Sequence, residues 1–371
     1  MACPVDVVGE TIVMFAPMTT WRGLINSDYR RWLPVTHNTP VVSLHEGNTP
    51  LLRSDHLSSL TGCDIWLKVE GANPTGSFKD RGMTVAVSNA AENGAEGVIC
   101  ASTGNTSASA AAYAARAGIA CVVLVPEKAI ALGKLAQVVR YGARIVEVAG
   151  TFDDCLRIAR DLAAHHRVAL VNSVNNQWRL AGQRTVAYEI VDALGDAPDI
   201  HCLPVGNGGN ITATWSGYQT YAAEGPAGRT PRMWGFQAAG AAPLVHGAPV
   251  AVPDTAASAI RVGNPATWDG AVSARDESRG LIRAVTDEQI FDAYRAVARH
   301  DGVFAEPASV AGIAGILDQR RRGRLAPGQR IVITLSGNGL KDLDASMGDG
   351  YTSTRTSAST ADVARALRLT D

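Results

Sequence analysis

The chain has 371 residues, of which 46% are hydrophobic and 19% are charged, and its formal net charge at pH 7 is −1. This length allows two lobes of ordinary size around a large buried core. The near-neutral charge gives no electrostatic basis for binding nucleic acid or a membrane surface, so we expect neither as a partner.

The first 35 residues fit a globular pattern least well. Val5 to Met18 is apolar but is interrupted by Asp6 and Glu10, and no basic segment precedes it. A secretory signal needs that basic segment, and a membrane span needs about 20 apolar residues in a row, so we expect neither. Residues 1–35 are therefore predicted to be an atypical N-terminal segment, which is a true extension, a swapped arm or the result of a misassigned start.

Residues 73–81, Asn-Pro-Thr-Gly-Ser-Phe-Lys-Asp-Arg, place one lysine in a glycine-containing loop between a predicted strand and a predicted helix. A lysine that bonds covalently to an aldehyde must be accessible and partly neutral, and a desolvated loop at the edge of an α/β sheet suits both needs. Lys79 is therefore a candidate anchor for an aldehyde cofactor. A lysine followed by Asp80 and Arg81 is also an ordinary charged helix start, so both interpretations stay open for this segment alone.

A hydroxyl-rich turn over 101–109 follows the apolar run 97–100 and precedes an alanine-rich stretch over 110–117. Such a turn presents backbone N–H groups at a helix N-terminus, where an anion such as a carboxylate is favoured. Helix capping explains one or two of the hydroxyls, but it does not explain six polar or glycine positions in a row. The turn is therefore a candidate carboxylate site.

Strand and helix signals alternate through the middle of the chain. Val122 to Val125 and Ile145 to Val148 are predicted strands, and Leu132 to Tyr141 and Phe152 to Ala164 are predicted helices, which indicates parallel sheets flanked by helices. The pair His165-His166 is predicted to mark a solvated helix end, because no carboxylate or cysteine ligands accompany it. The six cysteines form no C-x-x-C or C-x-x-H pair, so we expect reduced core residues and no metal site.

A glycine-rich turn over 203–212 again lies between a strand-like run and a helical one. Its three glycines let backbone amides approach a phosphate closely, and the dipole of the following helix adds to the attraction. The spacing differs from the dinucleotide fingerprint and from the P-loop, since no Gly-Lys-Ser or Gly-Lys-Thr follows. We expect residues 206–210 to bind a phosphate that is not part of a nucleotide, although such a turn is often only a tight connection.

The last strand signal, over 331–335, ends in Ser336 and two glycines. A serine at that place can hydrogen-bond a pyridine nitrogen without carrying charge, which keeps the nitrogen largely unprotonated. Without the other motifs in the chain, Ser336 would be interpreted as a turn residue. Residues 348–361 are rich in Ser and Thr and predict a linker, after which Val363, Leu367 and Leu369 predict a short terminal helix.

Taken together, these segments resemble the fold-type II pyridoxal phosphate enzymes, and within that group the similarity to the threonine synthases is close. The resemblance runs in the family's order from about Thr49 to Asp342, and four further segments carry it: 133–137, 152–154, 172–175 and 306–309. It implies an α/β fold of two lobes with twisted parallel sheets, and pyridoxal 5'-phosphate as cofactor. A smaller mobile lobe would span 89–182, and a larger cofactor-binding lobe would combine 36–88 and 183–347. The active site would lie in the cleft between them, and 348–371 would form the C-terminal linker and helix.

The resemblance also implies residue roles. Lys79 would carry the cofactor and later move protons, Phe78 would lie beside the ring, Asn105 would bond the 3-oxygen and Ser336 would face the pyridine nitrogen. The remaining cofactor contacts, which hold its phosphate, would be Gly206, Asn207, Gly208, Gly209 and Asn210. The substrate carboxylate would be bound by Thr103, Thr106 and Ser107. The substrate phosphate would be bound by Lys134, Asn172, Ser173 and Arg179, where the arginine fork suits a dianion.

The activity implied is the conversion of O-phospho-L-homoserine and water to L-threonine and phosphate by a cytoplasmic enzyme, and relatives are commonly homodimers. The chain departs from the family over 176–181, which is one residue longer, lacks the usual proline and has Ala181 in place of glutamate. Ser336 stands where close members have threonine, which keeps the hydroxyl. Two alternatives stay open: a dehydratase or replacement enzyme that acts on another amino acid, and a non-catalytic ligand-binding relative.

Overall fold

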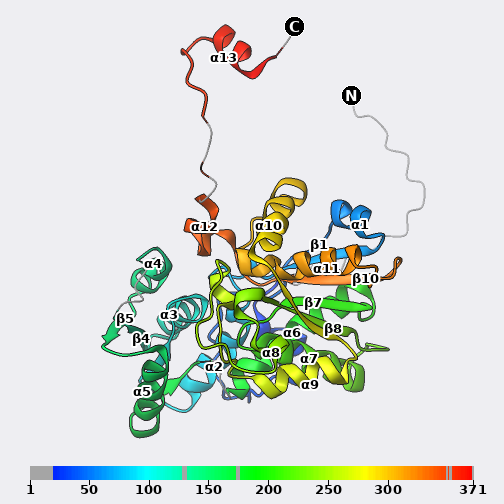
Figure 1. Ribbon diagram of the computed structural model, residues 1–371. Coiled ribbons are helices and arrows are strands. Elements are labelled where there is room, and N and C mark those ends of the chain that lie inside the picture. The colour runs from blue at the N-terminus through cyan, green and yellow to red at the C-terminus, as the bar shows by residue number, and fades with distance from the viewer. Residues whose placement is uncertain (1–19, 128–131, 173–175, 348–349, 351–352, 370–371) are drawn as a thin grey trace, which may run out of the picture.

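A computed structural model describes residues 20–127, 132–172, 176–347, 350 and 353–369. Two sheets lie side by side in it, and helices cover both of them (Figure 1). The prediction of parallel sheets flanked by helices is confirmed. The strands and helices predicted between Val122 and Ala164 are also present, with ends within two residues of those predicted.

The larger sheet has six strands in the order β1-β2-β10-β7-β8-β9. Neighbouring strands run parallel, except that β1 is antiparallel to β2. In sheet order the strands are Leu51–Arg53, Asp64–Val69, Arg330–Leu335, Ile200–Pro204, Arg232–Ala238 and Leu281–Val285. The central strands β7 and β10 are almost entirely buried, as expected for parallel strands that are covered on both faces.

The smaller sheet has four parallel strands in the order β5-β4-β3-β6. In that order they are Arg144–Val148, Ala120–Pro126, Gly97–Ala101 and Val168–Leu170. All four come from one continuous stretch of the chain, whereas the larger sheet is assembled from segments on both sides of that stretch. The proposed lobe boundaries at 89 and 182 stay a prediction.

Helices on each face of the two sheets form separate apolar cores. On the larger sheet, α1 (Asp55–Thr61), α10 (Asp287–Asp301) and α11 (Ala311–Arg321) contribute to one core, while α6 (Gln177–Leu194), α7 (Gly209–Glu224), α8 (Pro243–His246) and α9 (Trp268–Glu277) contribute to the other. On the smaller sheet, α2 (Lys79–Glu92), α3 (Asn105–Ala117) and α4 (Leu132–Arg140) lie on one side and α5 (Phe152–His165) on the other. Short 3₁₀ segments are Leu24–Asn26, Asp28–Trp32, Glu70–Ala72, Ala239–Ala241, Ser258–Ile260, Pro307–Val310 and Gly339–Lys341.

Helices α2 and α6 pack against each other so closely that two glycines are required. A Cβ atom on Gly82 would lie 2.5 Å from the carbonyl oxygen of Arg179, and one on Gly182 would lie 1.9 Å from that of Arg81. The Arg81 guanidinium, which is buried at the same crossing, forms ion pairs with Glu70 at 2.6 Å and Glu189 at 2.7 Å. Paired burial of these charges ties α2 to α6 and holds the start of α2 in place.

The described part of the N-terminal segment packs into the body of the protein. Leu24 and Ile25 are fully buried in a small core with Val85 of α2, and the ring of Trp32 lies 5.3 Å from that of Tyr188. The predicted extension over 1–35 therefore contributes core residues from at least Leu24 onward, while residues 1–19 lie outside the described ones.

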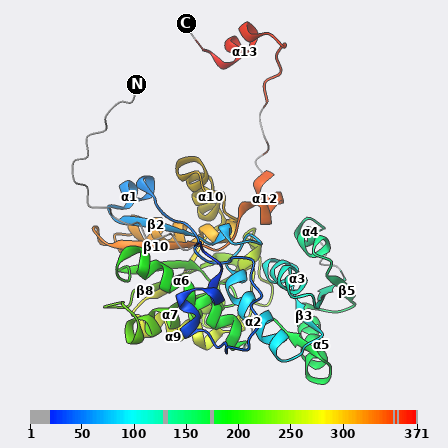
Figure 2. The ribbon, with the colours of Figure 1, turned by 180° about the vertical axis from the view of Figure 1, so that it is seen from behind.

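The predicted C-terminal helix is present as α13 (Thr360–Leu367), beyond α12 (Leu343–Met347). In both views α13 stands apart from the two sheets (Figure 2). Among the described residues, no helix is both long enough and apolar enough to cross a membrane.

Candidate active site

The lysine loop, the glycine-rich turn and the segment that begins with Ser336 converge at the carboxyl end of the larger sheet. Strands β7 and β10 are parallel neighbours with Ile333 opposite Cys202, so the segments that leave them, at Gly206 and Ser336, emerge side by side. The lysine loop joins them because Ser77 forms an antiparallel bridge with Gly337. The carboxyl edge of an open parallel sheet is the usual place for a ligand site.

Lys79 is the first residue of α2, and the preceding Phe78 is anchored because its N–H donates to the Ser336 carbonyl at 3.0 Å. Lys79 Nζ lies 4.4 Å from the centre of the Phe78 ring. Burial lowers the pKa of Lys79 to about 7, and the nearby charge of Arg179 acts in the same direction while Glu306 opposes it. At neutral pH much of this amine is therefore unprotonated, as a nucleophilic lysine requires.

The glycine loop forms the N-terminus of α7. Gly208 precedes the helix in the left-handed conformation, with φ of 82°, and a Cβ there would lie 2.5 Å from the Thr267 carbonyl oxygen. Within the described part of the chain no side chain caps this helix, so its first N–H groups stay open to an anion. The Asn207 carbonyl accepts from Thr267 N–H at 3.0 Å, which braces the loop from outside.

The hydroxyl-rich turn forms the N-terminus of α3. Thr106 and Ser107 are buried, Thr103 is partly exposed, and the Ser107 hydroxyl donates to the Gly104 carbonyl at 2.8 Å. Asn105 Nδ2 donates to both carboxylate oxygens of Glu306, at 3.1 and 3.3 Å. This contact brings the smaller sheet's helix to the edge of the larger sheet, so the turn faces the same site as Lys79.

Arg179 is fully buried at the start of α6 and has two unused donors. Its Nη1 donates to the Val171 carbonyl, whereas Nε and Nη2 have no hydrogen-bond partner among the described residues. Burial lowers the pKa of Arg179 to about 10, against the attraction of Cys100 and Asp80. A buried cation with open N–H groups is a strong candidate for binding an anion.

The unusual 176–181 segment forms the first turn of α6. Asn176 is the N-cap, and its side-chain oxygen accepts from Arg179 N–H at 3.0 Å. An asparagine cap starts the helix and fixes the backbone of Arg179 in its first turn.

The structure gives less information about the other three residues predicted to bind the substrate phosphate. The Asn172 side chain accepts from Ala101 N–H and donates to the Ala101 carbonyl, both at 2.9 Å, so it joins the ends of β6 and β3. Lys134 lies in the first turn of α4, and its side chain falls outside the description. Ser173 lies outside the described residues. The roles of these three residues stay predictions.

Sequence reasoning assigned no role to four residues that the structure brings to the site. Ser309 Oγ lies 3.0 Å from Ser336 Oγ and accepts from Gly337 N–H at 2.8 Å. Burial raises the pKa of Glu306 to about 7. Asp80 accepts from Thr75 and Ser109, and Lys341 Nζ donates to the Thr75 carbonyl at 3.1 Å and to Gln137. Glu306, Ser309 and Lys341 all lie in family-like motifs, but their partners are distant in sequence.

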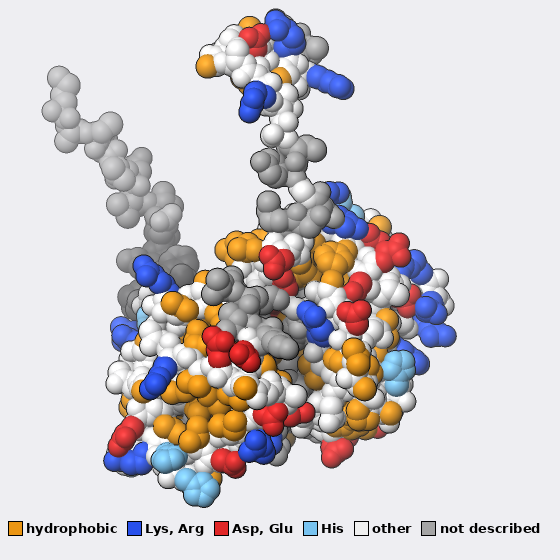
Figure 3. Space-filling view, turned by 60° about the vertical axis from the view of Figure 1, so that its left-hand side comes forward, with side chains coloured by type: hydrophobic (Ala, Val, Ile, Leu, Met, Phe, Trp, Pro, Cys, Tyr) orange, Lys and Arg blue, Asp and Glu red, His pale blue; other side chains and the backbone are white. Residues whose placement is uncertain are grey.

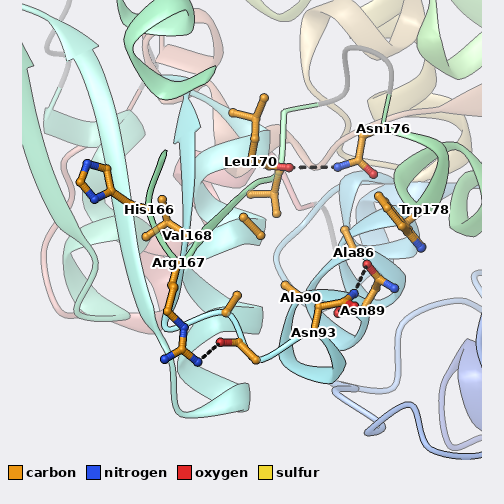
Figure 4. Close-up of a pocket in the computed structure, with 14 residues that line it drawn as sticks. Ala86, Asn89, Ala90, Asn93, His166, Arg167, Val168, Leu170, Asn176 and Trp178 are labelled. Carbon is orange, nitrogen blue, oxygen red and sulfur yellow. Dashed lines mark hydrogen bonds between the residues drawn. The ribbon is translucent and has the colours of Figure 1, made fainter. Parts of the chain in front are cut away.

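A cavity of about 320 Å³ lies away from this site, beside the C-terminal half of α2 and the edge strand β6. Asn89, Asn93 and Trp178 are among its lining residues, and Asn176 donates from its rim to the Leu170 carbonyl (Figure 4). No residue predicted for the active site lines it.

Charged side chains of both signs are interspersed on the face that carries the smaller sheet, and neither sign dominates it (Figure 3). Of the described cysteines, all five are buried and unpaired, and no described group of His, Cys, Asp and Glu could hold a metal ion.

Comparisons with known proteins show the family to which the chain belongs. The model of the family described as pyridoxal-phosphate dependent enzyme matches residues 42–337. The chain is 58% identical to the threonine synthase of Mycobacterium leprae, over 89% of this chain and 91% of that one, and 54% identical to that of Synechocystis, over 88% and 85%. Among solved structures, maize serine racemase matches with a TM-score of 0.71 at 22% identity, over 84% of this chain and 95% of that one, which shows a shared fold.

Proposed function

We propose that the chain, which belongs to the pyridoxal-phosphate dependent enzyme family, is a threonine synthase that converts O-phospho-L-homoserine and water to L-threonine and phosphate, because it is 58% and 54% identical to two threonine synthases. One observation carries the choice of substrate. Lys79, whose amine is partly unprotonated at neutral pH, lies close enough to the buried Arg179 for the arginine's charge to lower its pKa. Arg179 Nε and Nη2 have no hydrogen-bond partner among the described residues. A covalent anchor beside an anion site is what an amino acid that carries a phosphate requires.

The residues present fit pyridoxal 5'-phosphate. The open N–H groups at the start of α7, with Gly208 in a conformation that favours glycine, suit its phosphate. Ser336 is buried and uncharged, which suits its pyridine nitrogen, and Asn105 suits its 3-oxygen. When bound, the cofactor supplies an electron-accepting ring that stabilises negative charge next to the substrate's amino group.

We assign the proton transfers at the substrate's α- and β-carbons to Lys79. Its lowered pKa makes the free amine available as a base at neutral pH, and the protonated amine can return a proton later. Phe78 borders the path of the lysine, since Nζ lies 4.4 Å from its ring. The face of that ring attracts the protonated amine, whereas burial favours the neutral one.

The substrate's two anionic ends are assigned to two different elements. The N-terminus of α3, with Thr103, Thr106 and Ser107, receives the carboxylate through open N–H groups and the threonine hydroxyls, while the Ser107 hydroxyl bonds the Gly104 carbonyl. Arg179 offers two charge-assisted hydrogen bonds to the phosphate and so stabilises it as it leaves the γ-carbon. Lys134, Asn172 and Ser173 are proposed to complete the phosphate site.

Two further properties are part of the proposal. Five buried free cysteines suit a reducing compartment, so we place the enzyme in the cytoplasm. We also expect a homodimer in which 89–182 moves as a smaller lobe against the rest. The mass of the purified protein in solution tests whether it is a homodimer. Protease protection with and without substrate tests whether 89–182 moves.

The test is an assay of the purified, cofactor-loaded protein with O-phospho-L-homoserine that follows phosphate release and identifies the product by mass. Equal amounts of threonine and phosphate are expected. A dehydratase would instead release ammonia and a keto acid from serine or threonine, and it would not form threonine and phosphate from O-phospho-L-homoserine. Lys79→Arg is the matched control, because it keeps a long basic side chain but cannot hold the cofactor covalently, and it should lose both turnover and the visible absorbance of the lysine-bound cofactor.

A further inference from the structure

Glu306 is a buried carboxylate with no role in the reaction as described so far. It is 4% exposed and follows Ala305, which bridges to Asn338, and its own N–H donates to the Gly337 carbonyl at 3.0 Å. A Cβ atom at position 337 would lie 2.4 Å from Glu306 Oε1. The backbone at the end of β10 therefore leaves room for this carboxylate and holds it close.

The carboxylate is directed at one atom of the site. Asn105 Nδ2 donates to Oε1 at 3.1 Å and to Oε2 at 3.3 Å, across a sequence separation of 201 residues. The two ends of an asparagine carboxamide have the same shape, so packing alone does not decide which end faces which way. The ionised form of the carboxylate, which prevails above its pKa of about 7, accepts hydrogen bonds only and therefore selects the orientation in which Nδ2 faces Glu306.

This orientation matters for the ligand assigned to Asn105. The amide nitrogen has two hydrogens, and Glu306 can occupy one while the other stays free to donate to the cofactor's 3-oxygen. A flipped amide would instead present its oxygen, which cannot donate a bond to a negatively charged oxygen and would repel it. The charged groups around Glu306 are Lys79 on α2 and Lys341 and Asp342 on the segment after β10.

We propose that Glu306 is a positioning residue that orients the Asn105 carboxamide and so keeps a hydrogen-bond donor directed at the cofactor's 3-oxygen. The inference rests on the proposed function and deepens its cofactor site. It predicts that Glu306 acts through Asn105 and that its removal raises the affinity of the 3-oxygen for a proton.

The test uses Glu306→Ala and Glu306→Gln, each in the wild-type and in an Asn105→Ala background. Apoprotein is titrated with pyridoxal phosphate, and the visible spectrum of the loaded protein is followed against pH. Loss of a charge-oriented hydrogen bond is expected to weaken cofactor binding roughly tenfold in Glu306→Ala. The pH at which the spectrum changes should shift upward, and Glu306→Gln should be intermediate because its Oε1 still accepts from Asn105.

The background variant separates positioning from packing. In the Asn105→Ala protein, Glu306→Ala should change cofactor affinity and the spectral pH less than about twofold, because the group through which Glu306 acts is absent. A change as large as in the wild-type background would overturn the proposal. So would a spectrum of Glu306→Ala that titrates like that of the wild type.

Asp318→Asn is the matched control, because Asp318 is a buried carboxylate on α11 that pairs with Arg322 at 2.6 Å. It should lower stability without moving the spectral pH. Measurements on the wild type distinguish the proposed function from the role of Glu306. Wild-type protein that binds no cofactor would refute the proposed function together with this inference, whereas normal wild-type turnover with unaffected Glu306 variants would refute this inference alone.

Discussion

Arg179 and Arg81 form a matched pair for which we predict opposite effects of the same substitution. Both side chains are almost completely buried, at 0% and 1% exposure, and they lie on the two helices that cross at Gly82 and Gly182. Arg81 is paired with Glu70 and Glu189, whereas Arg179 has two N–H donors without a partner among the described residues. Arg179→Met and Arg81→Met remove the same charge and leave a side chain of similar length.

The magnitudes follow from the partners. Each of the two unsatisfied buried donors costs about 1–3 kcal/mol and losing the bond to Val171 costs about 1 kcal/mol, so Arg179→Met should stabilise the apoprotein by about 1–5 kcal/mol. Arg81→Met leaves two buried carboxylates short of their cation and should destabilise it by about 3–5 kcal/mol. For catalysis, two charge-assisted bonds of about 1.5–3 kcal/mol each predict a fall in kcat/KM of roughly 10²–10⁴ in Arg179→Met.

Denaturant unfolding of apoprotein in a phosphate-free buffer measures the stabilities, and phosphate release from O-phospho-L-homoserine measures kcat/KM. Added inorganic phosphate should stabilise the wild type more than Arg179→Met, since both proteins keep the open N–H groups at the start of α7 and only the wild type also offers the Arg179 site. If Arg179→Met were destabilised as much as Arg81→Met, or kept kcat/KM within threefold of wild type, the assignment of Arg179 as an open anion site would be wrong.

Three further predictions concern the lysine and two glycines. The pKa of Lys79 is about 7 in the folded apoprotein against 10.5 for the ordinary side chain, so between these values the unfolded state binds the extra proton and stability should rise with pH, by up to about 1.4 kcal/mol per pH unit. Lys79→Met should lack this rise in pH-dependent unfolding, and an equal slope in both proteins would contradict the assigned pKa. Gly182→Ala would place a Cβ 1.9 Å from the Arg81 carbonyl and should cost about 1–3 kcal/mol or more, measured as a lower thermal midpoint; an unchanged midpoint would mean that the helix crossing is looser than described. Gly208→Ala combines a positive φ with a contact of 2.5 Å to Thr267 and should weaken cofactor binding in a titration, while Gly247→Ala, which has a similar φ of 73° but open space, is the control that should bind normally.

Local signals along the chain were sufficient for the elements and for the residues that carry family-like motifs. Alternating apolar runs and turn residues located the strands β3, β4, β7 and β10 and the glycine loop after β7, because period and turn chemistry are local properties. The same reasoning missed the packing of Leu24 and Ile25, since two apolar residues in a short 3₁₀ segment have no period that predicts burial.

The roles of Glu306, Ser309 and Lys341 could not be read from neighbouring residues. Glu306 meets Asn105 across 201 positions, and Lys341 meets Gln137 across 204. Such contacts depend on the order of strands in the sheets, which a single sequence does not state. The open donors of Arg179 are likewise visible only after every neighbouring acceptor has been placed.

By itself the sequence determined the chemistry available to this protein: a lysine in a glycine-containing loop, a glycine turn before a helix, a hydroxyl turn before another, and a neutral serine after a buried strand. Only the tertiary structure decided how that chemistry is tuned. The parallel register of β7 and β10 brings the motifs to one edge, and the close crossing of α2 and α6 brings the start of α2 next to the buried Arg179. Proton affinity and open hydrogen-bonding capacity depend on desolvation and on distant neighbours, and these exist only in the folded chain.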